Sequence, residues 1–186
     1  MFSFLRDLMQ LILSPAHGWE DIARNAESVE RLRSSGLYPL TAVSALSVFL
    51  QGIYHVDKGL PELLVGAVVT FVMFFVGYFC GVFVLTTAMP GMQAPGTHTG
   101  ERRINTLAIY CTALLELIDI MANCVPITMA LTLFLPLFLV VVIYKGAKYL
   151  RVDAQYTVRY VAITTLALVA VPYLLQYLFE LALIRP

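Results

Sequence analysis

The chain has 186 residues, of which 60% are apolar and only 13% are charged, whereas an average soluble domain has about 45–50% apolar and about 25% charged residues. Its 12 basic and 12 acidic residues leave no net charge, so no overall electrostatic field favours nucleic acid. This composition excludes a soluble enzyme, a secreted disulfide scaffold and a disordered chain, because too few polar residues are present to cover a soluble surface. It predicts a small multi-pass membrane protein.

Residues 1–36 are predicted to form a cytoplasmic amphipathic helical segment. Residues 2–13 place their polar side chains on one stripe of a helix and apolar side chains on the rest, a pattern typical of a helix lying on a membrane surface. A serine followed by Pro15 predicts the start of a second helix. Trp19 and Ile22 share a face of that helix, and Trp19 suits an anchor at the membrane interface. The segment is expected either to cover the inner membrane surface or to dock a partner.

Residues 37–186 are predicted to form a membrane domain of five helical spans. A span needs about 20 mostly apolar residues, and it must be helical because lipid satisfies no backbone hydrogen bond. The predicted spans are residues 37–54, 63–89, 104–123, 127–144 and 158–183. The expected fold is therefore all-α, an integral membrane bundle of five transmembrane helices preceded by the amphipathic segment.

Lys and Arg residues in the connections predict the orientation of the chain. The N-terminal segment and the connections after the second and fourth spans together carry ten of them, and five spans put these three regions on one side. The opposite side has two, Lys58 and Arg185. Because cytoplasmic loops are enriched in Lys and Arg, the N-terminus is predicted to be cytoplasmic and the C-terminus extracytoplasmic.

The third predicted span carries two carboxylates, Glu116 and Asp119. Their spacing of three puts both on one helical face, and Asn123 extends the row. Ionisable groups at membrane depth are costly and usually face a bundle interior or water, and two nearby carboxylates in a low dielectric are expected to share a proton or a cation. The row predicts either an ion or proton site in a small transporter, or side chains that reach water at the outer interface.

Other polar and small residues indicate packing rather than chemistry. Gly77 and Gly81 form a Gly-x-x-x-Gly pair, which predicts close helix contact within the bundle or between two copies. The three cysteines have no regular spacing and the three histidines form no pair at ligand spacing, so we expect no disulfide framework, metal site or cofactor. A phosphate-binding glycine loop and a nucleophile elbow are also missing, so the sequence predicts a protein that is not an enzyme.

A cytoplasmic Pro-x-x-x-Trp element, Pro15 to Trp19, precedes Tyr38-Pro39-Leu40 at the start of the first span. This order, together with five spans, resembles the Yip family (Ypt/Rab-interacting proteins), in particular its bacterial branch. The sequence Gly-Leu-Tyr-Pro at 36–39 lacks the aspartate and the inserted glycine of the Asp-Leu-Tyr-Gly-Pro type motif of eukaryotic relatives. The resemblance implies a multi-pass protein of the bacterial inner (cytoplasmic) membrane. The candidate residues for docking to a partner or to the membrane surface are Pro15, Trp19, Ile22, Tyr38 and Pro39.

Two functions are predicted. The first, implied by the resemblance, is a non-enzymatic membrane scaffold or organiser of membrane proteins or lipids. The alternative is a small proton- or cation-coupled transporter that uses Glu116 and Asp119. The expected partners are the lipid bilayer and either another membrane protein or a second copy of the chain, with no nucleic acid. A polar cavity reaching the two carboxylates would favour transport, and side chains pointing to the outer headgroup layer would count against it.

Overall fold

The computed structural model describes residues 2–54, 58–94, 96–97, 99–125 and 129–183, and these residues form helices and loops without a strand. Two short helices, α1 (Phe2–Leu13) and α2 (Pro15–Asn25), come first. The long helices that follow are broken in places into shorter segments. Their bounds are α3 Val29–Leu32, η1 Arg33–Leu37, α4 Tyr38–Ser47, η2 Val48–Leu50, α5 Gln51–Tyr54, α6 Leu60–Ala88, η3 Met89–Gly91, α7 Glu101–Cys124, α8 Met129–Tyr149, η4 Ala154–Tyr156, α9 Thr157–Thr165, η5 Leu166–Ala170 and α10 Val171–Leu183.

The all-α prediction is confirmed for this part of the chain. Four helices in it are long and apolar enough to cross a membrane: Val29–Tyr54, Leu60–Gly91, Glu101–Cys124 and Ala154–Phe179. They overlap the first, second, third and fifth predicted spans and are compatible with a membrane-embedded protein. The fourth predicted span, 127–144, begins with residues outside the described ones and continues in α8. Five spans therefore stay a prediction.

Two of the long helices contain a π turn, a wider turn of helix, just before a proline. A proline has no N–H to bond the carbonyl four residues earlier, so an α-helix cannot pass through it unchanged. Before Pro39, Tyr38 N–H donates to the carbonyl of Arg33 five residues back, and before Pro172 the N–H of Val171 does the same with Leu166. The π turns η1 and η5 result, and they let both helices continue across their prolines.

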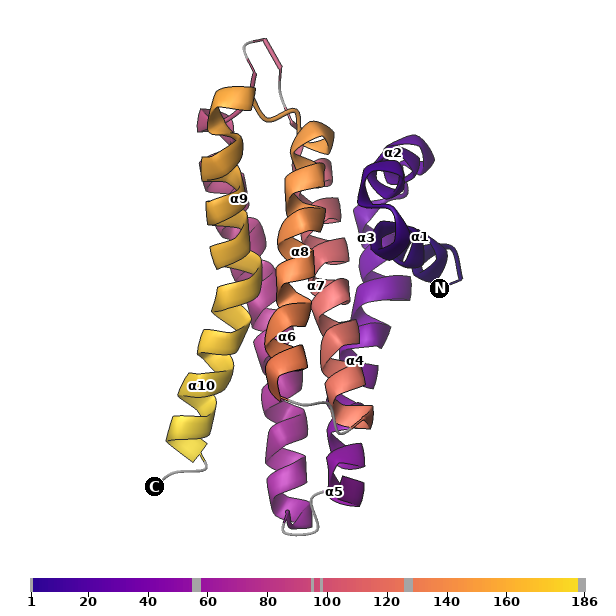
Figure 1. The fold of residues 1–186 in the computed structure, drawn as a ribbon, viewed down its shortest axis with the longest axis vertical. Helices are drawn as coiled ribbons and strands as arrows, with labels where there is room; N and C mark the ends of the chain where they lie inside the picture. Colours follow the sequence, from indigo (N-terminus) through magenta and orange to yellow (C-terminus); the bar gives the residue numbers. More distant parts are fainter. Residues whose placement is uncertain (1, 55–57, 95, 98, 126–128, 184–186) are drawn as a thin grey trace.

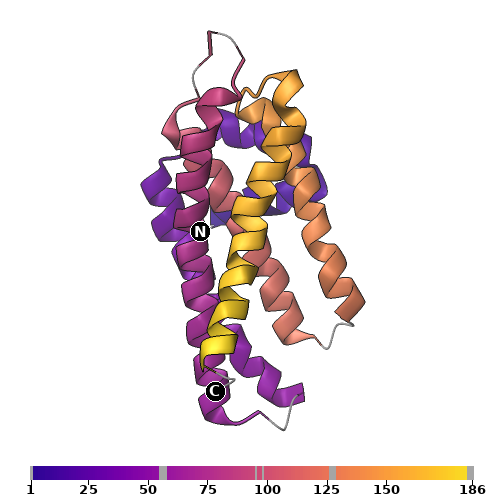
Figure 2. The ribbon, with the colours of Figure 1, turned by 90° about the vertical axis from the view of Figure 1, so that its left-hand side faces the viewer.

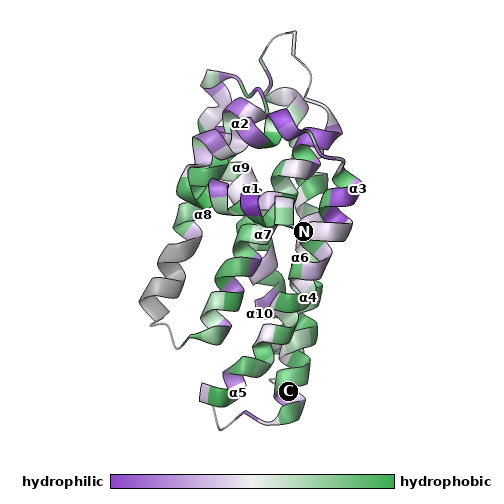
Figure 3. Cartoon of the chain, turned by 90° about the vertical axis from the view of Figure 1, so that its right-hand side faces the viewer, coloured by the Kyte–Doolittle hydropathy of each residue, from purple (hydrophilic) through white to green (hydrophobic). Residues whose placement is uncertain are grey.

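The long helices lie side by side, and α1 and α2 lie against one flank of the bundle beside α7 and α8 (Figures 1 and 2). The ends of α7 and α8 near Cys124 and Met129 stop short of the neighbouring end formed by α5 and the start of α6. Hydrophilic residues gather on α2 and on the helix ends beside it, whereas the helices below are mostly hydrophobic (Figure 3). The molecule thus has one polar end, and at its opposite end the helices stop at two different levels.

Gly77 and Gly81 lie where α6 contacts η5 and α10. A Cβ atom at Gly77 would stand 2.7 Å from Pro172 Cγ, and one at Gly81 would collide with Leu168 Cδ2. Because the missing side chains let the two helices approach, this pair of glycines mediates packing inside one chain.

Candidate functional site

Polar side chains from two parallel helices meet inside the bundle and form what we call the polar seam. One half comes from the Val29–Tyr54 helix and the other from α7. Its members are Thr41, Ser44, Ser47 and Gln51, facing Glu116, Asp119 and Asn123. Both sets recur every three or four residues, so each occupies a single helical face. The three residues predicted from the sequence as an ion or proton site are therefore together, and each has a partner on the neighbouring helix.

The outer part of the polar seam is a continuous chain of hydrogen bonds. Lys58 Nζ donates to Gln51 Oε1 across 2.7 Å, and Gln51 Nε2 donates to Asn123 Oδ1 across 2.5 Å. The Asn123 amide then donates to Ser47 Oγ at 2.8 Å and to Asp119 Oδ2 at 3.3 Å. The chain links Lys58, on the predicted outer side, to the carboxylate of Asp119.

Glu116 ends the seam at its deepest point. Its side chain is fully buried, and among the described residues Oε2 has no hydrogen-bond partner. Thr41 Oγ1 lies 2.5 Å from Glu116 Oε1 and 3.0 Å from the carbonyl oxygen of Leu37. The Thr41 hydroxyl has one proton for these two acceptors, so both contacts are satisfied either by a shared proton or by a protonated Glu116 that donates to Thr41.

A polar cavity of about 350 Å³ opens beside the seam, where α7 stops short of α5 and α6. It has room for many water molecules, since about 10–15 Å³ of such space is enough for one. Its polar lining comes from four helices and the connection before α6: Gln51, Lys58, Glu62, Thr70, Asp119, Asn123 and Gln176. Asp119 therefore has access to water, whereas Glu116, one helical turn deeper, does not line the cavity.

On the other side of Glu116 the seam is closed. One turn further along the same two helix faces lie Leu37 and Thr112, and Ile109 follows one turn beyond Thr112; all three are buried. Beyond them Arg33 Nε donates to the Tyr78 hydroxyl at 2.7 Å, and this hydroxyl donates to Asn105 Oδ1 at 3.0 Å. The polar seam is thus open only toward the predicted outer side.

Neither carboxylate of the seam forms an ion pair in the part of the chain that the structure describes. The ion pairs found there involve only Asp7, Glu20 and Asp21 as acidic partners. No group of three His, Cys, Asp or Glu side chains suited to a metal ion occurs among the described residues either. His17 lies exposed on α2, and His55 and His98 fall outside the described residues.

The N-terminal residues singled out by the sequence pack against the bundle. Trp19 is only 2% exposed, its indole Nε1 donates to the carbonyl of Val142 in α8 at 2.9 Å, and its ring stacks on Tyr149 at 5.2 Å between centroids. Ile22 is buried on the same face, and Pro15 begins α2 in a half-buried position. This face of α2 is therefore covered by the chain itself.

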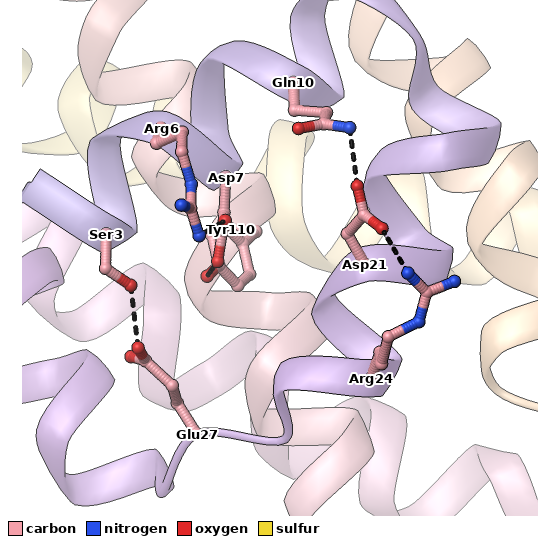
Figure 4. A network of polar contacts seen from close by, with 8 residues as sticks. All are labelled: Ser3, Arg6, Asp7, Gln10, Asp21, Arg24, Glu27 and Tyr110. Atoms are coloured by element: carbon pink, nitrogen blue, oxygen red, sulfur yellow. Dashed lines mark hydrogen bonds and ion pairs between the residues drawn. The ribbon is translucent and has the colours of Figure 1, made fainter.

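The polar stripe of α1 is also used within the chain, as Figure 4 shows. Gln10 Nε2 donates to Asp21 at 2.5 Å, and Ser3 Oγ donates to Glu27 at 2.7 Å. Asp7 is buried and accepts a hydrogen bond of 3.4 Å from the Tyr110 hydroxyl of α7. These contacts bind α1 to α2 and to the bundle at the level of Tyr110.

Tyr38 and Pro39, the other candidate docking residues, begin α4. The Tyr38 ring packs against Phe75 of α6, with 5.9 Å between centroids, whereas Trp19 packs against α8. The two groups of predicted docking residues thus contact different helices.

Sequence reasoning missed half of the polar seam. The half that was missed lies in a predicted span without a charged residue, and a few uncharged polar side chains leave that span apolar overall. These side chains are Thr41, Ser44, Ser47 and Gln51. Their spacing of three, three and four was the available signal, because it places all of them on one face.

Comparison with protein-family models, characterised proteins and solved structures finds no match for this chain. The resemblance to the Yip family therefore stays a prediction.

Proposed function

We infer that this protein is a small proton-coupled transporter that uses Glu116 and Asp119. The observation that supports this function is the polar seam, which leads from a cavity with room for water to a fully buried carboxyl group that has no ion-pair partner among the described residues. Ionisable groups at membrane depth are rare, and they commonly mark proton or ion pathways.

The proposed pathway has three steps. Water in the cavity exchanges a proton with Asp119, and Asp119 exchanges it with Glu116, which lies about 4.5 Å further along the helix axis. A second conformation then connects Glu116 to the inner side by opening the closed side of the seam at Leu37. The π turn η1 ends at Leu37, and π turns inside helices are frequent at functional sites.

The orientation and location stay part of the proposal. An excess of ten to two Lys and Arg residues supports a cytoplasmic N-terminus and an extracytoplasmic C-terminus. The bacterial inner membrane rests on the resemblance alone. In this orientation the cavity faces outside.

The scaffold function implied by the resemblance would use the N-terminal helices. Trp19 and Ile22 are engaged in packing against α7 and α8, so a partner would have to bind another face of α2 or displace it. The geometry supports transport better.

Proton flux into proteoliposomes tests the proposal. The vesicles contain a pH-sensitive dye, and an imposed pH gradient drives flux through the wild type, Glu116→Gln, Asp119→Asn and the control Glu101→Gln. Glu101 is an exposed carboxylate at the start of α7, so it offers the same change of charge on the same helix. Flux in the wild type and in Glu101→Gln, with at least a tenfold loss in the two seam variants, is expected. Equal flux above that of empty vesicles in all four proteins would contradict the proposal.

A further inference from the structure

A cationic pocket lies at the polar end of the molecule, near the start of α7, whereas the polar seam lies in the second half of that helix. Its volume is about 560 Å³, and α2, α7, α8 and the start of α9 line it. Three cationic side chains, Arg103, Lys145 and Lys148, face it with one acidic side chain, Glu20. Glu20 is 3.2 Å from Lys148 Nζ, so two positive charges stay uncompensated by carboxylates in the lining.

Aromatic rings and hydrogen bonds fix two of the cationic groups. Arg103 Nη1 donates to the Tyr149 carbonyl at 2.8 Å, and its guanidinium lies 5.4 Å from the centroid of the Tyr149 ring. Lys145 Nζ lies 5.6 Å from the ring centroid of Tyr144, which is half exposed. Side chains held in this way form a prepared site for an anion, since less conformational entropy is lost on binding.

An apolar groove continues from this pocket between α8 and α9. Its volume is about 480 Å³, and it shares Tyr144 and Thr157 with the cationic pocket. Apart from these two and Thr165, its lining is aliphatic: Val140, Val158, Val161, Ala162 and Leu166. From Thr157 to Leu166 the helix rises about 14 Å, close to the half-thickness of about 15 Å of a bilayer's hydrocarbon core.

We propose that the cationic pocket and the apolar groove together bind one anionic phospholipid of the inner leaflet. The phosphate of the headgroup lies beside Arg103 and Lys145, and an acyl chain follows the groove along α8 and α9. Basic pockets between membrane helices on the cytoplasmic side are suited to such headgroups. A cationic pocket joined to an apolar groove favours a lipid over a free phosphate, because a free phosphate would leave the groove unfilled. This site does not depend on the proposed transport.

Native mass spectrometry of the purified full-length protein, with phosphatidylglycerol or phosphatidylcholine of identical chains added, tests the proposal. The wild type is expected to retain phosphatidylglycerol at least roughly tenfold better than phosphatidylcholine, because each Lys or Arg near an anionic headgroup adds binding energy. Lys145→Gln/Lys148→Gln should remove this preference, and the control Arg24→Gln/Arg31→Gln, which removes two exposed charges elsewhere at the same end, should keep it.

A second pair of variants tests the groove. Ala162→Trp fills it and should release phosphatidylglycerol, whereas Val68→Trp, a control on the exposed face of α6, should not. Equal retention of both lipids by the wild type would overturn the proposal, and so would retention that survives Lys145→Gln/Lys148→Gln. Retention unaffected by Ala162→Trp, or displacement of the lipid by millimolar inorganic phosphate, would replace it with a simple phosphate site.

Discussion

Ser44 donates a hydrogen bond of 2.7 Å to Asp119, across the contact between α4 and α7. Thr41 and Glu116 meet in the same way one turn away, so the two helices hold their polar residues at matching levels. Parallel helices aligned by several such pairs cannot slide past one another without breaking all of them at once. The polar seam therefore fixes the position of α4 relative to α7 as well as providing a path.

Thr41→Val is expected to destabilise the protein, because it leaves the buried Glu116 carboxyl without its hydroxyl partner. A buried polar group left unpaired costs about 1–3 kcal/mol, compared with an average of about 0.6 kcal/mol for interhelical hydrogen bonds in a membrane. We expect a loss of about 1–2 kcal/mol in the free energy of unfolding, measured in mixed micelles.

Thr87→Val is the matched control for this variant. Thr87 donates to the carbonyl of Phe83 four residues earlier, as Thr41 does to Leu37, but it is exposed and faces no carboxylate. It should change stability by less than about 0.5 kcal/mol. The double variant Thr41→Val/Glu116→Leu should recover part of the loss, since both partners are then apolar. A Thr41→Val protein as stable as the wild type would contradict the arrangement.

Trp19 is the only tryptophan of the chain, so its fluorescence reports directly on the packing of α2. Because the ring is buried against α7 and α8, water-borne acrylamide and brominated lipids should both quench it weakly. Strong quenching by the lipids would place Trp19 at the membrane surface, and strong quenching by acrylamide would place it in water. Either result would contradict this packing.

Gly77→Val should destabilise the bundle by about 1–3 kcal/mol, the usual cost of forcing extra atoms into a packed interior. The added atoms would meet the rigid ring of Pro172, which cannot turn away as a flexible side chain could. Gly91→Val is the control, because a Cβ atom there has no neighbour within 4 Å. Thermal unfolding in detergent separates the two, and similar melting temperatures would argue against the contact between α6 and α10.

Cysteines introduced on the two sides of Glu116 should differ in their access to water. Thr70→Cys lines the cavity, so an impermeant thiol reagent added outside cells should label it above the level of the wild type with its own three cysteines. Thr112→Cys lies buried on the closed side of Glu116 and should stay unlabelled. Labelling of Thr70→Cys only from the cytoplasmic side would reverse the proposed orientation.

The sequence predicted the helices well because their signal is local. The four apolar helices of membrane length follow from the length of their apolar runs, and the row of Glu116, Asp119 and Asn123 follows from the helical period. What the row contacts depends on which helix lies beside α7, and no local pattern determines that. Thr41 and Ser44 could therefore be recognised as partners only in the folded chain.

For the N-terminal segment, too, the sequence predicted the helix but not its contacts. Its amphipathic pattern predicts a helix with a polar and an apolar face, but not which surface each face meets. Asp7 was expected on a polar stripe and lies buried beside Tyr110, because α7 supplies a hydroxyl partner. Trp19 was expected to suit the membrane interface, and it finds its hydrogen-bond acceptor in α8 instead. A buried polar group needs a partner, and a distant helix provides it in both cases.

On the proposed pathway Glu116 holds a proton that reaches water through Asp119, and infrared difference spectroscopy of the protein in membranes detects such a proton. We expect a C=O band of a protonated carboxyl group that is lost in Glu116→Gln and kept in Glu101→Gln. In heavy water this band should shift, and the shift should be slower in Asp119→Asn. A wild type without such a band, or a band that Glu116→Gln leaves unchanged, would contradict this pathway.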